Sequence, residues 1–274
     1  MTTKKVEEAV KDTELWFAVL DSLHKFDELE VNGVVNSILS PTLPEECVIS
    51  TYYRAQSNVC SLLEFKHPKH FQAIGMIARS LFELAVDIAL IGTEAGAPLK
   101  MRGFNDIEKL KTCRSVVAFE NQNPLTMIPS SQLQQDYISN NEARIVALAQ
   151  SLWPGKKLRD LSHWSGMTLS KRVGLLPLDM QELYACFYKQ LSWAVHPGLQ
   201  GSYGLKPETF AHFCGQGYIL AARNYERILS TIIRTTQLDK HDPLIGSKMQ
   251  LARYLPLTES EQDELALRRD LGLL

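Results

Sequence analysis

The chain has 274 residues, with 29 lysines and arginines against 31 aspartates and glutamates, so its formal net charge is −2. Hydrophobic residues make up 45% and charged residues 22%, which excludes a disordered, collagen-like or membrane-embedded chain. A net charge near zero also excludes a broadly basic surface that coats nucleic acid, but it does not exclude a local basic site.

Cysteine usage and the apolar stretches indicate the compartment. The five cysteines are scattered, odd in number and without a C-x-x-C pair, so we expect reduced thiols acting as small core residues. The N-terminus carries both signs of charge and no apolar segment of the kind found in signal peptides. The most apolar stretch, 74–91, contains Arg79, Glu83 and Asp87, which are costly in lipid. We therefore expect a cytoplasmic protein with no membrane contact.

Apolar residues recur every three or four positions along most of the chain, which predicts helices. Pro- and Gly-containing breaks, with Gly92, Gly96 and Pro98 ending the third helix, separate them. In chain order we expect helices over about 4–30, 44–65, 69–93, 105–120, 130–152, 179–196 and 208–237, and a short C-terminal helix opened by the capping box Thr258-x-x-Glu261. Strand signals are nearly absent.

This pattern predicts an all-α multi-helix bundle with a central apolar helix (69–93) and a long helix near its C-terminal end (208–237). We expect a single helical domain over 1–238. Residues 239–274 are then a C-terminal extension with a short helix, which packs on that domain or on a partner.

Familiar catalytic and cofactor motifs are missing. The sequence has no phosphate-binding loop, dinucleotide fingerprint, H-E-x-x-H, EF-hand or G-x-S-x-G elbow. His67 and His70 stand three apart near a helix start, a pattern more typical of surface residues than of metal ligands. We predict no cofactor and no metal.

The first candidate site lies in the most apolar helix. Arg79, Glu83 and Asp87 fall at i, i+4 and i+8 and form one stripe. Charges in such a helix must be paired or face a cleft, because burying a lone ion is costly. One interpretation is an ion pair between Arg79 and Glu83 that serves architecture alone. The other is a polar cleft in which Arg79 supplies a fixed cation.

The second candidate is the stripe Tyr188, Ser192 and His196. His196 precedes Pro197 at the helix C-terminus, where the partial negative charge favours the imidazolium form. The alternative is a C-terminal cap. A Ser192–His196 nucleophile pair lacks an identifiable third member. If this stripe met the first one, the combined arginine, carboxylate, phenol and imidazole would suit phosphodiester chemistry without a metal.

The third candidate is a basic segment that interleaves cations with a histidine and a tryptophan. Cations neutralise phosphates and an indole stacks on bases, which points to nucleic-acid binding. The alternative is a solvated loop whose tryptophan lies in the core. The residues are Lys156, Lys157, Arg159, His163, Trp164, Lys171 and Arg172.

Three short motifs occur in a fixed order: Arg79-Ser80-Leu81-Phe82-Glu83, Trp164-Ser165-Gly166 and Tyr188-x-x-x-Ser192-x-x-x-His196. Together they resemble the signatures of an uncharacterised, mostly bacterial all-helical family, a domain of unknown function, over about 53–234. That family is similar to abortive-infection proteins of phage defence and, more remotely, to the HEPN superfamily.

The resemblance implies a function, because many HEPN proteins are metal-independent ribonucleases. Their arginine and histidine are separated by four to six residues. This chain departs from that pattern: Lys189 stands where the arginine before His196 belongs, and Arg159 and His163 have three residues between them. Only Arg234 and His241, at the end of the longest helix, have six.

We predict a helical effector of a bacterial defence or stress-response system. It would act on RNA or a nucleotide through a cleft lined by Arg79, Glu83, Tyr188, Ser192 and His196, as a candidate metal-independent ribonuclease. The alternative is a non-catalytic interaction module, which binds a partner protein or a second copy through the helix 208–237 or the C-terminal helix.

Overall fold

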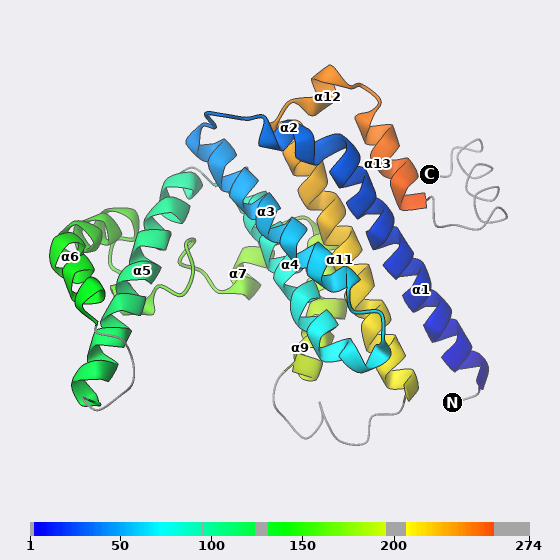
Figure 1. The fold of residues 1–274 in the computed structure, drawn as a ribbon, viewed down its shortest axis with the longest axis horizontal. Helices are drawn as coiled ribbons and strands as arrows, with labels where there is room; N and C mark the ends of the chain where they lie inside the picture. The colour runs from blue at the N-terminus through cyan, green and yellow to red at the C-terminus, as the bar shows by residue number, and fades with distance from the viewer. Residues whose placement is uncertain (1–2, 95, 124–130, 196–206, 255–274) are drawn as a thin grey trace. The chain divides into compact units, whose positions relative to one another are not determined.

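The structure is a computed structural model that describes residues 3–94, 96–123, 131–195 and 207–254. Every regular element in those ranges is helical and none is a β-strand, which confirms the predicted all-α fold (Figure 1). The α-helices are α1 (Thr3–Phe26), α2 (Asn32–Asn36), α3 (Leu43–Leu63), α4 (Phe71–Ile91), α5 (Ala97–Gln122), α6 (Gln132–Leu152), α7 (Leu169–Val173), α8 (Leu178–Leu183), α9 (Lys189–Val195), α11 (Pro207–Thr235), α12 (Leu238–His241) and α13 (Ile245–Tyr254). None of them combines the length and apolar character that a bilayer span requires.

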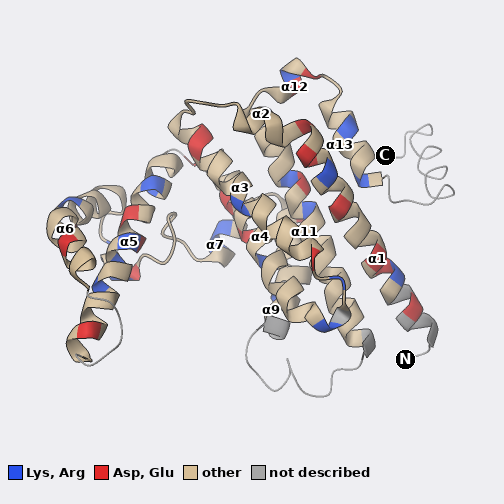
Figure 2. Ribbon diagram, in the orientation of Figure 1, with Lys and Arg blue, Asp and Glu red and all other residues tan. Residues whose placement is uncertain are grey.

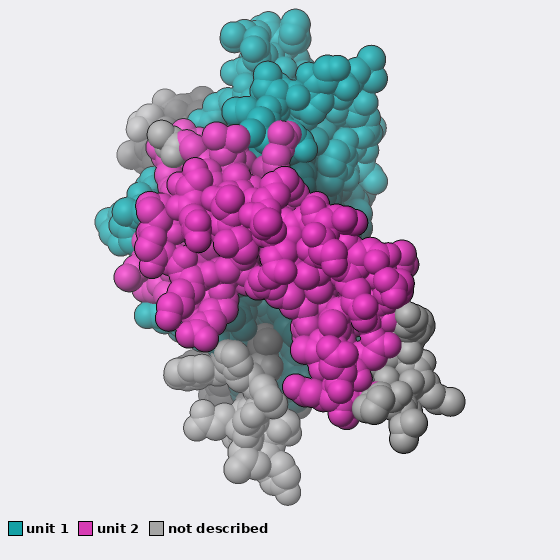
Figure 3. Space-filling model, turned by 90° about the vertical axis from the view of Figure 1, so that its left-hand side faces the viewer, with its two compact units in different colours: residues 1–89, 173–274 teal, residues 90–172 magenta. Residues whose placement is uncertain are grey.

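The chain divides into two compact units, coloured separately in Figure 3. Unit 1 comprises residues 1–89 and 173–274, and unit 2 comprises residues 90–172. Unit 2 thus lies within the range 1–238, for which the sequence predicted a single domain. One boundary falls near the end of α4 and the other in α7, so no flexible linker composition marks either of them in the sequence.

Unit 1 is built around two long helices, α1 and α11, which lie side by side, with α3 against α11 (Figure 1). The helix α4 also packs on α11, where the Phe71 and Phe210 rings are 4.8 Å apart. Burial of apolar side chains drives this association. The largest fully buried side chains of this core include Leu20, Leu23, Tyr52, Leu62, Ile74, Leu81, Phe82, Ile88, Tyr218 and Tyr225.

Two helix starts follow from local chemistry. At α3 the Thr42 amide donates to the Glu45 carboxylate at 2.7 Å, and Pro44 occupies the first turn. At α5 the order differs from the prediction, since Pro98 opens this helix instead of ending the previous one. The reason is Gly96, whose φ of +81° supplies the left-handed turn into α5.

Two predicted helices are interrupted by π-helical turns. The helix expected over 4–30 gives way after Phe26 to such a turn over Asp27–Val31. The helix expected over 179–196 consists of α8, a π-helical turn over Tyr184–Tyr188, and α9. A π turn holds an extra residue, so side chains on either side of it face other directions than a 3.6-residue repeat predicts.

Unit 2 consists of α5, α6 and the segment that follows them. The two helices pack against each other. Along α5, positively and negatively charged residues alternate with uncharged ones (Figure 2). The segment 155–174, expected to be irregular, contains a short 3-10 turn over Leu158–Asp160 and the helix α7, whose last residue, Val173, already belongs to unit 1. The buried core of unit 2 is Ile107, Leu110, Ile145, Ala149, Trp153 and Leu161.

The described part of the C-terminal extension packs on unit 1, where α13 lies against α1. Lys248 joins this helix to Glu30 through an ion pair of 3.0 Å. The capping box at Thr258 and Glu261 lies outside the described residues.

Candidate functional site

The two predicted polar stripes share a hydrogen-bonded cluster in unit 1. The Arg79 Nη2 atom donates to the Tyr188 hydroxyl at 3.0 Å, and that hydroxyl donates to Glu83 Oε1 at 2.6 Å. Arg79 and Glu83 lie one turn apart on α4, while Tyr188 is the last residue of the π-helical turn before α9. The phenol therefore connects two charges of opposite sign.

The environment of Tyr188 keeps it protonated. Its side chain is 7% exposed, and its ring packs 5.2 Å from that of Phe82. Burial, followed by the hydrogen bond to Glu83, raises the pKa of Tyr188 to about 12, although Arg79 acts in the opposite direction. At neutral pH the hydroxyl is consequently a donor to Glu83.

Arg79 retains capacity to bind an anion. Its guanidinium carbon lies 4.6 Å from the centroid of the Tyr188 ring, a cation–π distance. The buried Nε atom of Arg79 has no hydrogen-bond partner in the structure. The side chain as a whole is half-buried. The buried Nε is closed to a ligand in this conformation. A guanidinium has five N–H donors, however, so a phosphate or carboxylate would bind the Nη donors that Tyr188 does not use.

The remaining members of the two stripes are placed differently. The Ser192 hydroxyl donates to the Tyr188 backbone carbonyl at 2.9 Å, within its own helix. Asp87 is half-buried on α4. His196 lies outside the described residues. The cluster brought together is thus Arg79, Glu83 and Tyr188.

The basic segment of unit 2 divides into exposed and buried members. Lys156, Lys157, Arg159 and Lys171 are exposed. Trp164 is 3% exposed, so its indole ring is in the core and does not stack on a base in this conformation. Its carbonyl accepts a hydrogen bond of 2.8 Å from the indole of Trp153.

Two other members of that segment are also held by the protein. The guanidinium residue Arg172 is 4% exposed, which removes it from the surface available to a nucleic acid. His163 contacts the Ser165 hydroxyl through Nδ1 at 2.9 Å. The segment therefore offers four exposed cations, of which Lys156 also donates to the Gly166 carbonyl, and its tryptophan belongs to the core.

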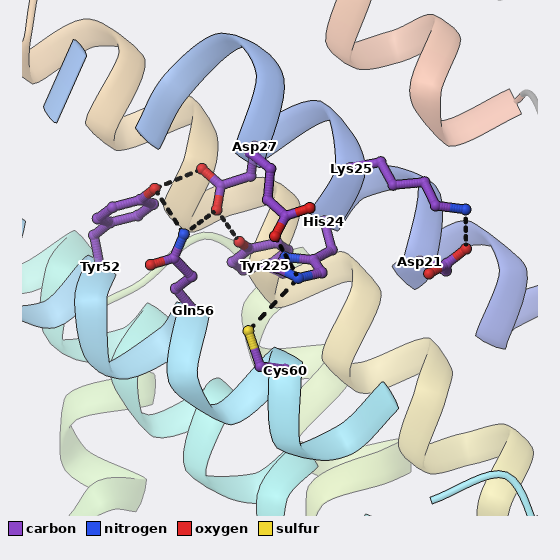
Figure 4. A network of polar contacts seen from close by, with 9 residues as sticks. Asp21, His24, Lys25, Asp27, Tyr52, Gln56, Cys60 and Tyr225 are labelled. Carbon is purple, nitrogen blue, oxygen red and sulfur yellow. Dashed lines mark hydrogen bonds and ion pairs between the residues drawn. The ribbon is translucent and has the colours of Figure 1, made fainter. Parts of the chain in front are cut away.

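A polar cluster that the sequence analysis did not identify surrounds Asp27 (Figure 4). The Asp27 carboxylate is fully buried and accepts hydrogen bonds from Tyr52 at 2.6 Å, from Gln56 at 3.1 Å and from Tyr225. Burial raises the pKa of Asp27, and these donors lower it in part. In the sequence, Asp27 stands in the acidic run Asp-Glu-Leu-Glu, which resembles a solvated surface. Its spacing of seven and four residues from Leu20 and Leu23, on the apolar face of the helix, is the one local signal of its burial.

The same cluster extends toward the surface through a histidine. The Nε2 atom of His24 lies 3.5 Å from both Cys60 Sγ and Glu28 Oε1. Within the residues that the structure describes, however, no group of three or more His, Cys, Asp or Glu side chains is arranged to hold a metal ion.

Comparison with protein-family models, curated proteins and solved structures gave no match. The resemblance to the bacterial helical family therefore stays a prediction from the three motifs. Two of the three motifs are in contact with each other in the structure, since Arg79, Phe82 and Glu83 of the first contact Tyr188 of the third.

The Arg79–Tyr188–Glu83 cluster can perform two chemical tasks. The guanidinium can bind and stabilise negative charge on a phosphate, as fixed cations do at phosphoryl sites. The carboxylate can accept a proton, either directly or through the phenol. Both tasks need only groups that the protein itself supplies.

Proposed function

We propose that this protein is a helical effector of a bacterial defence or stress-response system that binds RNA or a nucleotide at the Arg79–Tyr188–Glu83 cluster. The observation that carries the proposal is the pair of hydrogen bonds at the Tyr188 hydroxyl, because it unites a cation, a carboxylate and a phenol from distant parts of the sequence. Metal-independent phosphodiester cleavage is the reaction that this set of groups favours.

In this proposal Arg79 holds a phosphate and Glu83 is the proton acceptor. Tyr188 orients both, since its oxygen accepts from the guanidinium while its proton faces the carboxylate. Unit 2 carries a separate proposed contact surface for RNA phosphates, made of its exposed cations Lys156, Lys157, Arg159 and Lys171.

Arg79→Ala tests the proposal. We expect binding of a fluorescent single-stranded RNA, or of ATP as a nucleotide probe, to weaken by about 10- to 100-fold, since a hydrogen bond to a charged group is worth about 1.5–3 kcal/mol. Fluorescence anisotropy measures the binding, and gel analysis of the same RNA measures cleavage.

The matched control is Arg54→Ala, which removes an exposed arginine from α3 of the same unit. We expect this variant to bind as the wild type does. Equal loss in both variants would indicate general electrostatics, and full activity of Arg79→Ala would contradict the proposal.

The second candidate function is a non-catalytic module that binds a partner protein. The near-complete burial of Tyr188 favours it, because such a residue is suited to fixing helix packing. Under this candidate, Arg79→Ala lowers the melting temperature while RNA and nucleotide binding are absent from the wild type as well. Circular dichroism melts run beside the binding assay separate the two.

A further inference from the structure

The Asp27 cluster joins three parts of unit 1 that are far apart in the sequence. Asp27 begins the π-helical turn that follows α1, Tyr52 and Gln56 belong to α3, and Tyr225 lies in the middle of α11. All three helices converge on one carboxyl group (Figure 4). Protonation or deprotonation of that carboxyl therefore changes the hydrogen bonds at the junction of α1, α3 and α11.

The donors to this carboxyl are neutral. Two are phenols and one is an amide, and the carboxyl, Tyr52 and Tyr225 are each 0% exposed. Neutral donors compensate an ionised, fully buried carboxylate less well than a cation does. A protonated carboxyl fits the same site at lower cost, because it can donate its own proton to a neighbouring phenol oxygen.

The titratable groups around Asp27 come from each element packed on it. His24 faces it from α1, Tyr52 from α3 and Tyr225 from α11. Glu28 of the π-helical turn and Cys60 of α3 both contact His24. Burial and the neighbouring Asp27 charge raise the pKa values of both tyrosines far above neutral, so both stay protonated.

We propose that the protonation state of Asp27 controls how tightly α1, α3 and α11 of unit 1 pack together. Uptake of a proton by this carboxyl tightens the junction of α1, α3 and α11, and release of that proton loosens it. The carboxyl continues the buried face of α1, since Asp27 follows the buried Leu20 and Leu23 by seven and four residues, while its neighbours Glu28 and Leu29 are exposed. This inference is independent of the RNA-binding proposal, because it concerns the core of unit 1 and not the Arg79 cluster.

The sign of the pH dependence follows from the direction of the pKa shift. Because the folded chain holds the Asp27 proton more tightly than the unfolded chain, the associated stabilisation is fully present below the ordinary aspartate pKa of about 3.9. It is lost as the pH rises through the raised pKa. Acidic groups with lowered pKa values, such as Asp179, change the stability in the opposite direction. Their contribution is the same in the wild type and the variant, so it cancels when the two are compared.

The first experiment measures melting temperatures of the full chain and of Asp27→Asn between pH 4.5 and 8. The asparagine cannot ionise, so the wild type should gain on the variant by about 2–4 °C as the pH falls. Asp21→Asn is the matched control, since Asp21 lies on α1 shortly before Asp27 but pairs with Lys25 at the surface. A difference between wild type and Asp27→Asn that stays constant, or that grows as the pH rises, would overturn the proposal.

The second experiment reads the proton directly by difference infrared spectroscopy. We expect a protonated carboxyl band that titrates above the ordinary aspartate range in the wild type and in Asp21→Asn. If Asp27→Asn does not fold, Tyr225→Phe serves in its place, because loss of one donor should move the titration to higher pH. The proposed role of Asp27 protonation would be refuted by a band that titrates in the ordinary range in both the wild type and Tyr225→Phe. A band that persists unchanged in a folded Asp27→Asn would refute it as well.

Discussion

Truncation of Phe82 to alanine is expected to lower the free energy of unfolding by about 3–5 kcal/mol, the usual cost of removing a core phenylalanine. Phe82 is 0% exposed on α4, and its ring packs 5.2 Å from Tyr188 and 6.1 Å from Tyr184. The cavity would lie where two segments of unit 1 meet, and neighbouring rings can fill it only in part. Urea denaturation followed by circular dichroism gives the change.

The control for this prediction is Phe119→Ala. Phe119 is 47% exposed on α5, so its truncation should change the free energy of unfolding by less than about 0.5 kcal/mol. A cost below about 1 kcal/mol for Phe82→Ala would mean that α4 does not pack against the π-helical turn as the structure shows.

Substitution of Gly217 by valine is expected to destabilise the chain by about 3 kcal/mol, at the upper end of the range for overpacking. A Cβ atom at Gly217 would lie 2.6 Å from Cγ2 of Ile74, so α11 and α4 would have to move apart. Valine has a stiff χ1 and cannot turn its methyl groups away. Thermal unfolding measures the effect.

Gly246 provides the comparison, because a Cβ atom there meets nothing within 4 Å. Gly246→Ala on α13 should stabilise the chain by about 0.5–1 kcal/mol, since alanine loses less backbone entropy in a helix. If neither substitution lowered the stability, α11 would not approach α4 as closely at Gly217 as the structure shows.

The fold class could be predicted because apolar spacing and Pro or Gly breaks act locally. For example, Pro44 lies in the first turn of α3, and Gly155, with a φ of +79°, follows the end of α6. Pro98 shows the limit of such signals. A proline suits both the end of one helix and the first turn of the next, and only the left-handed Gly96 beside it decides between them.

The π-helical turns could not be predicted, since the sequence 27–31 and the sequence 184–188 contain no residue type that requires them. Their side chains face where tertiary packing places them. Asp27 was not identified as a core residue because it begins an acidic run, although it shares the helical face of Leu20 and Leu23. For Trp164 the sequence left two alternatives open, stacking on a base or burial in the core, because the choice depends on tertiary packing. The structure places its ring in the core.

The candidate site was predicted as two separate stripes. Spacing along each helix gave the members, but no sequence signal reports whether residues 105 and 109 positions apart in the chain touch. The hydrogen bonds of Tyr188 to Glu83 and Arg79 supply that information. Ser192 shares the stripe of Tyr188, yet its hydroxyl is used by its own helix.

RNA binding and cleavage by Tyr188→Phe, measured beside Tyr53→Phe, test the proposed site most directly. The first substitution deletes only the hydroxyl that joins Arg79 to Glu83, and the second deletes a hydroxyl of α3 that bonds to Asn36 at 2.6 Å. We predict a loss of at least about tenfold for Tyr188→Phe, because proton transfer and phosphate orientation both depend on that oxygen, and wild-type behaviour for Tyr53→Phe. A folded Tyr188→Phe with full activity, or a wild type that binds neither RNA nor ATP, would contradict the proposed function.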